Sequence, residues 1–275
     1  MTTQAEKARA FIELHHRDGA FIIPNPWNEG SARLLEALGF EALATTSSGF
    51  AYSLGRADGE VGLEEKLEHC RRLCAATTIP VSADLENGYA EDPERAAETI
   101  TRAAEAGVVG GSIEDFSGDA TSPIYELELA VERVSAAVAA ARELPFPFTL
   151  TARAENFLHR RKDLDDTIRR LQAFENAGAD VLYAPGLTSL DQVRAVTSAL
   201  TKPVNVLGVM VKGVNVSQLA EAGAKRVSIG GALARAAWAP VLRAVSEMRD
   251  SESFDWTRDL AAGSEVERRF RSVSE

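Results

Sequence analysis

The chain of 275 residues has little of what disulfide-stabilised and membrane-bound proteins need. Its two cysteines, Cys70 and Cys74, are too few for a disulfide framework. They lie four residues apart in KLEHCRRLC, so a helix would place both thiols on one side, where helix packing explains them better than metal binding. No apolar run approaches the roughly 18 to 20 residues of a membrane span. The start, MTTQAEKARAF, lacks the apolar core of a signal peptide, so we expect a cytoplasmic protein.

Positive charge is also scarce. Lysine and arginine number 30 against 41 acidic residues, which gives a net charge of −11 and a pI near 5.0. Nucleic acids and anionic membrane surfaces attract basic patches, so we expect neither as a partner. A small anionic ligand would have to be met by cationic groups gathered locally.

Short apolar runs rich in β-forming residues alternate with segments of helical periodicity. Several helical segments close on a glycine, as in AEAGV, ENAGADV and AEAGAKRV, which suits a helix C-cap before the next buried strand. Eight such runs predict a (β/α)8 TIM barrel, for which about 250 residues is typical. The alternative is an open doubly wound sheet, but no G-x-G-x-x-G follows the first run. The eight runs span residues 20–25, 42–48, 79–86, 109–115, 147–154, 180–185, 203–208 and 226–231.

The domain organisation is simple, because no linker or low-complexity segment interrupts the chain. We expect a barrel catalytic domain over residues 1–240. Residues 241–275 then form a C-terminal helical extension, which is either part of the same domain or lies at a subunit interface.

Acidic residues gather where the third and fourth runs end. Asp84 and Glu86 end the third run in SADLENGY, and Glu114 and Asp115 end the fourth in SIED. Barrel active sites lie at the C-terminal ends of the strands, and neighbouring strands are only about 4.8 Å apart, so at least three carboxylates should converge. Such a cluster favours a hard divalent cation such as Mg²⁺. The alternative is that the acids face outward as helix caps or salt-bridge partners.

Two further features share this rim. Arg153, in TARAEN, could offer paired donors to a carboxylate or phosphonate, or could serve as a structural partner for Glu155 or Glu175. The hydroxyl-rich run from Thr46 through Ser48 could let the backbone approach an anion, although such turns are also common as plain loops.

The ordered segments TTSSGFAYSLGRADG, SADLENGY, SIED and TARAEN resemble the isocitrate lyase / phosphoenolpyruvate mutase superfamily over roughly residues 20 to 235. The resemblance implies a Mg²⁺-dependent barrel, with Mn²⁺ as the alternative ion. Its members stabilise enolate-type intermediates of 2-oxo acids while making or breaking C–C or P–C bonds. The partner is then a small 2-oxo or 2-hydroxy carboxylate.

Carried over residue by residue, the resemblance assigns Asp84 as a direct metal ligand, with Glu86 and Glu114 holding metal-bound waters. The superfamily more often has Asp-x-Asp here, so whether Glu86 contacts the metal directly or through water stays open. Asp58, in GRAD, would lie near the metal network and would join Glu114 and Arg153 among the catalytic residues.

Substrate binding is assigned in the same way, from the resemblance. A substrate carboxylate would be bound by Thr46, Ser47 and Ser48, and the anionic end of the substrate by Arg153. The superfamily also commonly exchanges a C-terminal helix between subunits. The helix that carries Trp238 is then expected to pack on a neighbour in a homodimer or homotetramer.

The segment after the fourth run, DFSGDATSPIYELE, departs from the superfamily. Isocitrate and 2-methylisocitrate lyases resemble one another in a Lys-Lys/Arg-Cys-Gly-His motif here, and phosphonomutases in Lys and Asn, but this segment has no Cys, Lys, His or Asn. We therefore expect decarboxylation of an oxaloacetate-like acid, or retro-aldol cleavage with Tyr52, Glu155, His159 or Tyr183 as the candidate base. The alternatives are phosphonomutase chemistry and a barrel that binds 2-oxo acids without turnover.

Overall fold

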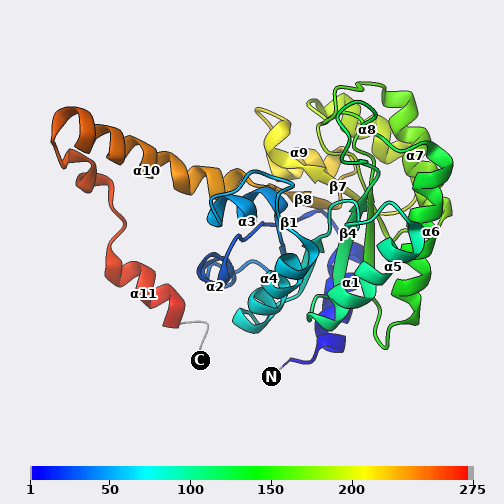
Figure 1. Cartoon of the computed structure of the whole chain (residues 1–275), viewed down its shortest axis with the longest axis horizontal. Helices are drawn as coiled ribbons and strands as arrows, with labels where there is room; N and C mark the ends of the chain where they lie inside the picture. The colour runs from blue at the N-terminus through cyan, green and yellow to red at the C-terminus, as the bar shows by residue number, and fades with distance from the viewer. Residues whose placement is uncertain (1, 272–275) are drawn as a thin grey trace.

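The computed structural model describes residues 2–271, and a barrel of eight parallel strands lies at its centre (Figure 1). Consecutive strands pair in parallel register in the order β1-β8-β7-β6-β5-β4-β3-β2, and helices surround them. The predicted (β/α)8 fold is confirmed.

The strands are β1 (Phe21–Ile23), β2 (Leu43–Ala44), β3 (Val81–Asp84), β4 (Gly110–Glu114), β5 (Thr149–Arg153), β6 (Val181–Tyr183), β7 (Val204–Leu207) and β8 (Arg226–Ser228). The helices are α1 (Gln4–His16), α2 (Glu29–Ala37), α3 (Ser47–Ser53), α4 (Leu63–Ala76), α5 (Pro93–Glu105), α6 (Leu127–Glu143), α7 (Leu164–Asn176), α8 (Leu190–Ser198), η1 (Gly208–Met210), α9 (Val216–Glu221), α10 (Ala232–Ser251), η2 (Asp255–Asp259) and α11 (Gly263–Arg271).

A seam between β1 and β2 completes the ring. One backbone hydrogen bond crosses it, from the Ala44 amide to the Pro24 carbonyl at 3.1 Å. The buried Asn25 side chain adds two more across the seam, because its Nδ2 donates to the carbonyls of Ala44 and Thr45, and its Oδ1 accepts from two amides just after β8, on the other side of β1. Asn25 therefore joins the end of β1 to both of its neighbours in the ring, β2 and β8, with every hydrogen bond that its amide can make.

Each of the eight predicted runs contains a strand, but the second is much shorter than predicted. We expected strand over residues 42–48, and β2 ends at Ala44. Thr46 instead caps a new helix, α3, because its hydroxyl accepts the Gly49 amide at 3.3 Å. The hydroxyl-rich run is thus the start of a helix at the rim of the barrel.

The outer helices bury one apolar face each against the strands. In α5 the buried positions Ala96, Ile100 and Ala103 recur at helical spacing, and the Asp92 side chain caps the first turn. Gly107 then turns the chain with φ +101°, a conformation that favours glycine. The AEAGV signal thus ends α5 where the sequence predicts.

The C-terminal part forms an arm that projects from the barrel and returns (Figure 1). Helix α10 leaves the barrel beside α3, and α11 returns to α2, where Arg33 Nη2 donates to the Phe270 carbonyl at 3.0 Å. The boundary expected at residue 240 falls inside α10, which continues through Pro240.

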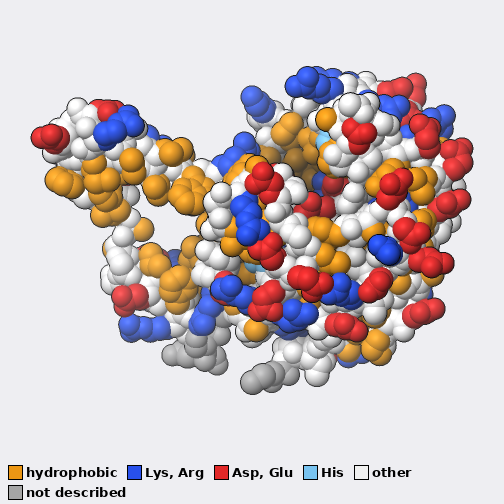
Figure 2. Space-filling view, viewed as in Figure 1, with side chains coloured by type: hydrophobic (Ala, Val, Ile, Leu, Met, Phe, Trp, Pro, Cys, Tyr) orange, Lys and Arg blue, Asp and Glu red, His pale blue; other side chains and the backbone are white. Residues whose placement is uncertain are grey.

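Apolar side chains gather along this arm (Figure 2). Large hydrophobic residues that are 43 to 66% exposed in the chain are Trp238, Val241, Leu242, Val245, Phe254 and Leu260. A contiguous exposed patch of this kind is typical of a protein–protein contact. No helix within residues 2–271 combines the length and the apolarity that a bilayer crossing requires.

Candidate active site

The C-terminal ends of the strands surround a cavity of about 200 Å³. Its wall includes many of the residues that the sequence singled out. The predicted site residues on the wall are Thr46, Ser47, Ser48, Asp58, Asp84 and Arg153. Glu86 and Glu114 are outside this lining, although both lie next to residues within it.

Arg153, at the end of β5, lies among three carboxylates. Its Nη1 is 2.8 Å from Asp84 Oδ1, its Nη2 is 3.0 Å from Glu114 Oε2, and its Nε is 2.8 Å from Glu155 Oε1. The structure therefore brings acids from three neighbouring strand ends together around one guanidinium. Of the two structural partners weighed for Arg153, Glu155 is found, whereas Glu175 bonds to backbone amides before β7.

Negative charge is in excess at this cluster. Burial raises the pKa of Glu114 well above its ordinary value, Arg153 offsets only part of this, and the carboxylates of Glu155, Asp84 and Glu86 raise it further. For Asp84, burial also raises the pKa, but the charges of Arg153 and Lys66 outweigh it, so the net shift is downward. Asp84 is thus held ionised, and Glu114 takes up a proton most readily.

Glu86 does not continue the strand. Because β3 ends at Asp84, the alternation of side chains ends with it, and Glu86 has a left-handed backbone with φ +50°. Its Oε1 accepts a hydrogen bond from the Tyr89 hydroxyl at 2.7 Å. Burial raises its pKa, with a further upward contribution from Asp84. The third run is predicted to extend to residue 86, but Asp84 is the last residue of β3 and Glu86 lies beyond the strand.

Sequence reasoning missed Lys66. It lies on α4 and is fully buried, and its Nζ has no hydrogen-bond partner and lies 5.9 Å from the ring centroid of Phe50. Its charge contributes to the downward pKa shift of Asp84 and offsets part of the upward shift that burial causes at Glu86. A signal was available, because Lys66 shares the apolar face of its helix with the buried Cys70, four residues on.

The charges at this cluster fit a divalent cation, although no complete ligand shell is preformed. Within residues 2–271, no group of three or more His, Cys, Asp or Glu side chains is arranged to hold a metal ion. Mg²⁺ is usually held by one or two carboxylates and by several waters, so Asp84 with Glu86 or Glu114 would suffice. The upward pKa shifts of Glu86 and Glu114 are what a site short of positive charge produces.

The first turn of α3, with its cap Thr46, is packed closely against the turn after β8. The Ser47 amide donates to Asp84 Oδ2 at 3.1 Å, and the hydroxyls of Thr46 and Ser48 are 3.2 Å apart. A Cβ on Gly231 would overlap Ser48 Oγ, so a larger residue there would displace the Ser48 hydroxyl. This turn therefore orients Asp84 as well as lining the cavity.

The candidate bases differ in their placement. Tyr183 lines the cavity, burial raises its pKa to about 12, and its ring lies 5.3 Å from the Arg153 guanidinium carbon. Glu155 is buried and bonded to Arg153. His159 stacks on Phe116 with ring centroids 3.9 Å apart and has Nε2 at 3.9 Å from Glu155 Oε2. Of these four candidates only Tyr183 lines the cavity, and His159 lies beside the acid cluster through its proximity to Glu155.

The segment after β4 is tied down at both ends. A β-bridge pairs Phe116 with Ile124, and the Ser117 hydroxyl donates to the Ser122 carbonyl at 2.7 Å. At its base, Asp115 Oδ2 is 3.3 Å from the buried Arg170 guanidinium. Asp115 therefore makes a structural contact with α7.

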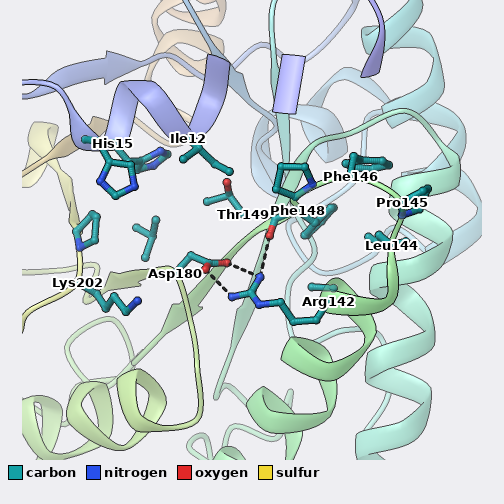
Figure 3. A pocket seen from close by; sticks show the side chains of 15 residues that line it. Ile12, His15, Arg142, Leu144, Pro145, Phe146, Phe148, Thr149, Asp180 and Lys202 are labelled. Atoms are coloured by element: carbon teal, nitrogen blue, oxygen red, sulfur yellow. Dashed lines mark hydrogen bonds and ion pairs between the residues drawn. The ribbon is translucent and has the colours of Figure 1, made fainter. Parts of the chain in front are cut away.

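A second hollow of about 580 Å³ opens at the opposite end of the barrel (Figure 3). Arg142 in its wall forms an ion pair of 2.5 Å with Asp180 and also donates to the Phe148 carbonyl. Barrel enzymes place catalysis at the C-terminal face, so the cavity around Arg153 is the candidate active site.

Fold and site together place the chain among the (β/α)8-barrel enzymes. The chain belongs to the phosphoenolpyruvate phosphomutase family, whose model matches residues 11–249, and so to the isocitrate lyase / phosphoenolpyruvate mutase superfamily that the motifs predicted.

Three similar proteins illustrate the range of this family. An uncharacterized protein of Mycobacterium tuberculosis H37Rv is 32% identical over 222 residues, covering 80% of this chain and 81% of its own. Oxaloacetate decarboxylase of Bradyrhizobium sp. ORS 278 is 30% identical over 233 residues, covering 81% and 78%. A solved Burkholderia cenocepacia J2315 structure, provisionally named a lyase/mutase, is 57% identical with a TM-score of 0.94, covering 97% and 96%.

Proposed function

We propose that the protein is a Mg²⁺-dependent carbon–carbon lyase or decarboxylase that acts on a small 2-oxo or 2-hydroxy dicarboxylate, such as oxaloacetate. The observation that carries the proposal is the single guanidinium of Arg153, bonded to Asp84, Glu114 and Glu155 at the wall of the cavity. The similarity to oxaloacetate decarboxylase supports the same reaction class.

Each group at the mouth has a defined part in this proposal. Asp84 is the direct metal ligand, with Glu86 and Glu114 holding its waters. Mg²⁺, when bound, supplies Lewis-acid stabilisation for charge that develops on the 2-oxo oxygen. Thr46, Ser47 and Ser48 bind the substrate carboxylate. These three side chains in the cavity wall are small and polar, so an anion can approach them closely.

The pKa shifts distinguish the acids of the cluster. Burial raises the pKa of Glu114, whereas the charges of Arg153 and Lys66 outweigh burial at Asp84 and lower its pKa. Arg153 orients Asp84 and Glu114 and keeps a guanidinium beside the incoming anion, and Asp58 faces the same mouth. We propose Glu114, Arg153 and Asp58 as the catalytic residues.

The test is an NMR time course on oxaloacetate, isocitrate, 2-methylisocitrate and phosphonopyruvate, each with protein and Mg²⁺, then with a chelator. Enzyme-free samples correct for spontaneous decarboxylation. We expect metal-dependent loss of oxaloacetate above the control rate. Persistence of all four compounds at control rates would refute the lyase proposal for these substrates and favour a barrel that binds without turnover.

Phosphonomutase chemistry is the second candidate, supported by the family match over residues 11–249. Its signature is a change in the ³¹P spectrum of phosphonopyruvate. The segment after β4 has neither the Lys and Asn of phosphonomutases nor the Cys motif of isocitrate lyases, which favours decarboxylation or a retro-aldol cleavage that needs no acid from this segment.

We also propose that the chain is a homodimer or homotetramer whose α10 packs on a neighbouring copy. The exposed apolar residues of the arm support this, because they would be covered there. Sedimentation should give a multiple of the 29.5 kDa chain mass, and Leu242→Glu should lower it. A monomeric wild-type protein would refute this.

A further inference from the structure

One buried arginine inside the barrel has no carboxylate partner. Arg226, the first residue of β8, is 5% exposed. Its Nε donates to Asn205 Oδ1 at 2.9 Å, its Nη2 to Thr151 Oγ1 at 3.1 Å, and its Nη1 lies 3.4 Å from His15 Nε2. No acid within residues 2–271 forms an ion pair with Arg226. Every group that its guanidinium contacts is therefore an amide, a hydroxyl or an imidazole.

This cation has no compensating charge. Burial lowers the pKa of His15 to about 3, so that its ring is neutral, and its Nδ1 bonds to the Phe11 carbonyl. Burial also lowers the pKa of Arg226, but only to about 10, so the guanidinium stays protonated at neutral pH. A buried charge without a partner is costly, and three contacts leave two of its five N–H donors for a ligand.

The cavity of the candidate active site reaches this guanidinium. Its wall includes Arg226, Asn205 and Ser228, together with the small hydroxyls of Ser82 and Ser112. Barrel interiors are usually filled by layers of Val, Ile and Leu. Here polar residues and open space take that place, so a small anion that enters from the mouth can contact Arg226.

Arg226 and Arg153 stand at the two ends of one row of paired residues. Arg153 pairs in register with Tyr183, Tyr183 with Asn205, and Asn205 with Arg226. Both arginines line the same cavity. A ligand with an anionic group at each end would therefore meet one guanidinium at the mouth and the other on the floor.

We propose that Arg226 binds the distal carboxylate of a dicarboxylate and makes the cavity select dicarboxylates over monocarboxylates. The proposal rests on the proposed function for the substrate class, but not for the reaction. Arg226 is a specificity-determining residue: it anchors the end of the ligand that does not react, while Asp84 and Arg153 face the other end.

The test is calorimetry with two ligand pairs of equal chain length: malate with 2-hydroxybutyrate, and 2-oxoglutarate with 2-oxopentanoate, all with Mg²⁺. In each pair a methyl group replaces the distal carboxylate. We expect the wild-type protein to bind at least one dicarboxylate about tenfold or more tightly than its partner, since a hydrogen-bonded charge pair is worth that much. Arg226→Gln should weaken the binding of that dicarboxylate by about tenfold to a hundredfold and leave the affinity for the monocarboxylate unchanged.

The controls separate specificity from folding. Arg133→Gln removes another fully buried arginine, one whose guanidinium bonds to backbone carbonyls outside the cavity, and should keep the preference. Arg226→Lys should keep part of it. If Arg226→Gln does not fold, a wild-type structure with the preferred dicarboxylate decides, since its distal carboxylate must lie within hydrogen-bond distance of Arg226.

The proposal is overturned if the wild-type protein binds none of the dicarboxylates, shows no preference, or places the distal carboxylate elsewhere. Equal weakening of both members of a pair by Arg226→Gln would also overturn it, because that indicates a purely structural role. A preference without turnover in the NMR assay would support Arg226 binding and refute only the proposed reaction.

Discussion

We predict that His69 makes the folded protein, and the packing of α3 in particular, less stable in acid. This residue of α4 is 4% exposed, and its ring stacks on Phe50 of α3 with centroids 3.8 Å apart and planes at 11°. Burial lowers its pKa to about 3, with further downward contributions from Lys66 and Arg72. Its Nε2 is buried without a hydrogen-bond partner, so the ring packs as a neutral aromatic. The stack is a contact that fixes α3, and hence Ser47, to the rest of the barrel.

The direction and the size of this loss of stability follow from the difference between the pKa values of His69 in the folded and the unfolded chain. Below pH 6.5 the unfolded chain binds a proton at His69 and the folded chain does not, so stability falls as the pH falls toward the folded pKa of about 3. The loss is about 1.4 kcal/mol per pH unit, or about 2 kcal/mol for His69 at pH 5. His15, whose pKa burial also lowers to about 3, should add a similar loss.

The assay is urea unfolding at pH 7.5 and pH 5.0 for the wild-type protein, His69→Phe, and His16→Gln at an exposed position as the matched control. His69→Phe keeps the stacked ring and loses no hydrogen bond at Nε2, so it should recover about 2 kcal/mol of the drop between the two pH values. His16→Gln should change the free energy of unfolding by no more than about 0.5 kcal/mol at either pH. A pH dependence in His69→Phe as large as in the wild-type protein would refute the reasoning.

Three other predictions concern the site and the core. Arg153→Met leaves buried carboxylates unpaired and should lower the free energy of unfolding by about 3–5 kcal/mol at pH 7.5, with Arg153→Lys less affected; an equal loss in both would contradict the pairing argument. Cys70 and Cys74, whose pKa values burial raises to about 11 and about 12, should react with a thiol reagent at pH 8 only after unfolding, and fast labelling of the native protein would contradict this. Gly231→Ala should cost about 1–3 kcal/mol in urea unfolding, most of it regained in the double variant with Ser48→Ala, because the added Cβ overlaps the Ser48 hydroxyl.

The strands could be predicted because their signals are local. An apolar run that follows a glycine C-cap, as β4 follows Gly107, indicates both the end of a helix and the start of a buried strand. Helix α3 was missed because SSGFAYS is short, and the capping role of Thr46 depends on where β2 stops. Sequence rules therefore placed the strands, while their exact ends were set by side-chain hydrogen bonds.

The candidate site was predictable to the extent that it follows from strand ends. Asp84, Glu114 and Arg153 lie where the barrel rule places them. Glu86 could not be placed, because nothing in SADLENGY reports the positive φ that takes it out of the strand. Arg226 was passed over, because an arginine at the start of a buried strand is usually taken to point into solvent, and only the closed barrel turns it inward.

The seam between β1 and β2 gives the barrel an uneven resistance to opening. One backbone hydrogen bond and the amide of Asn25 hold it, whereas β4 and β5 pair over five residues each. Local openings should therefore begin at the seam, and amide protons of β2 should exchange with solvent sooner than those of β5. Since the turn that holds Ser47 follows β2 directly, these openings would loosen one wall of the cavity while the rest of the sheet stays intact.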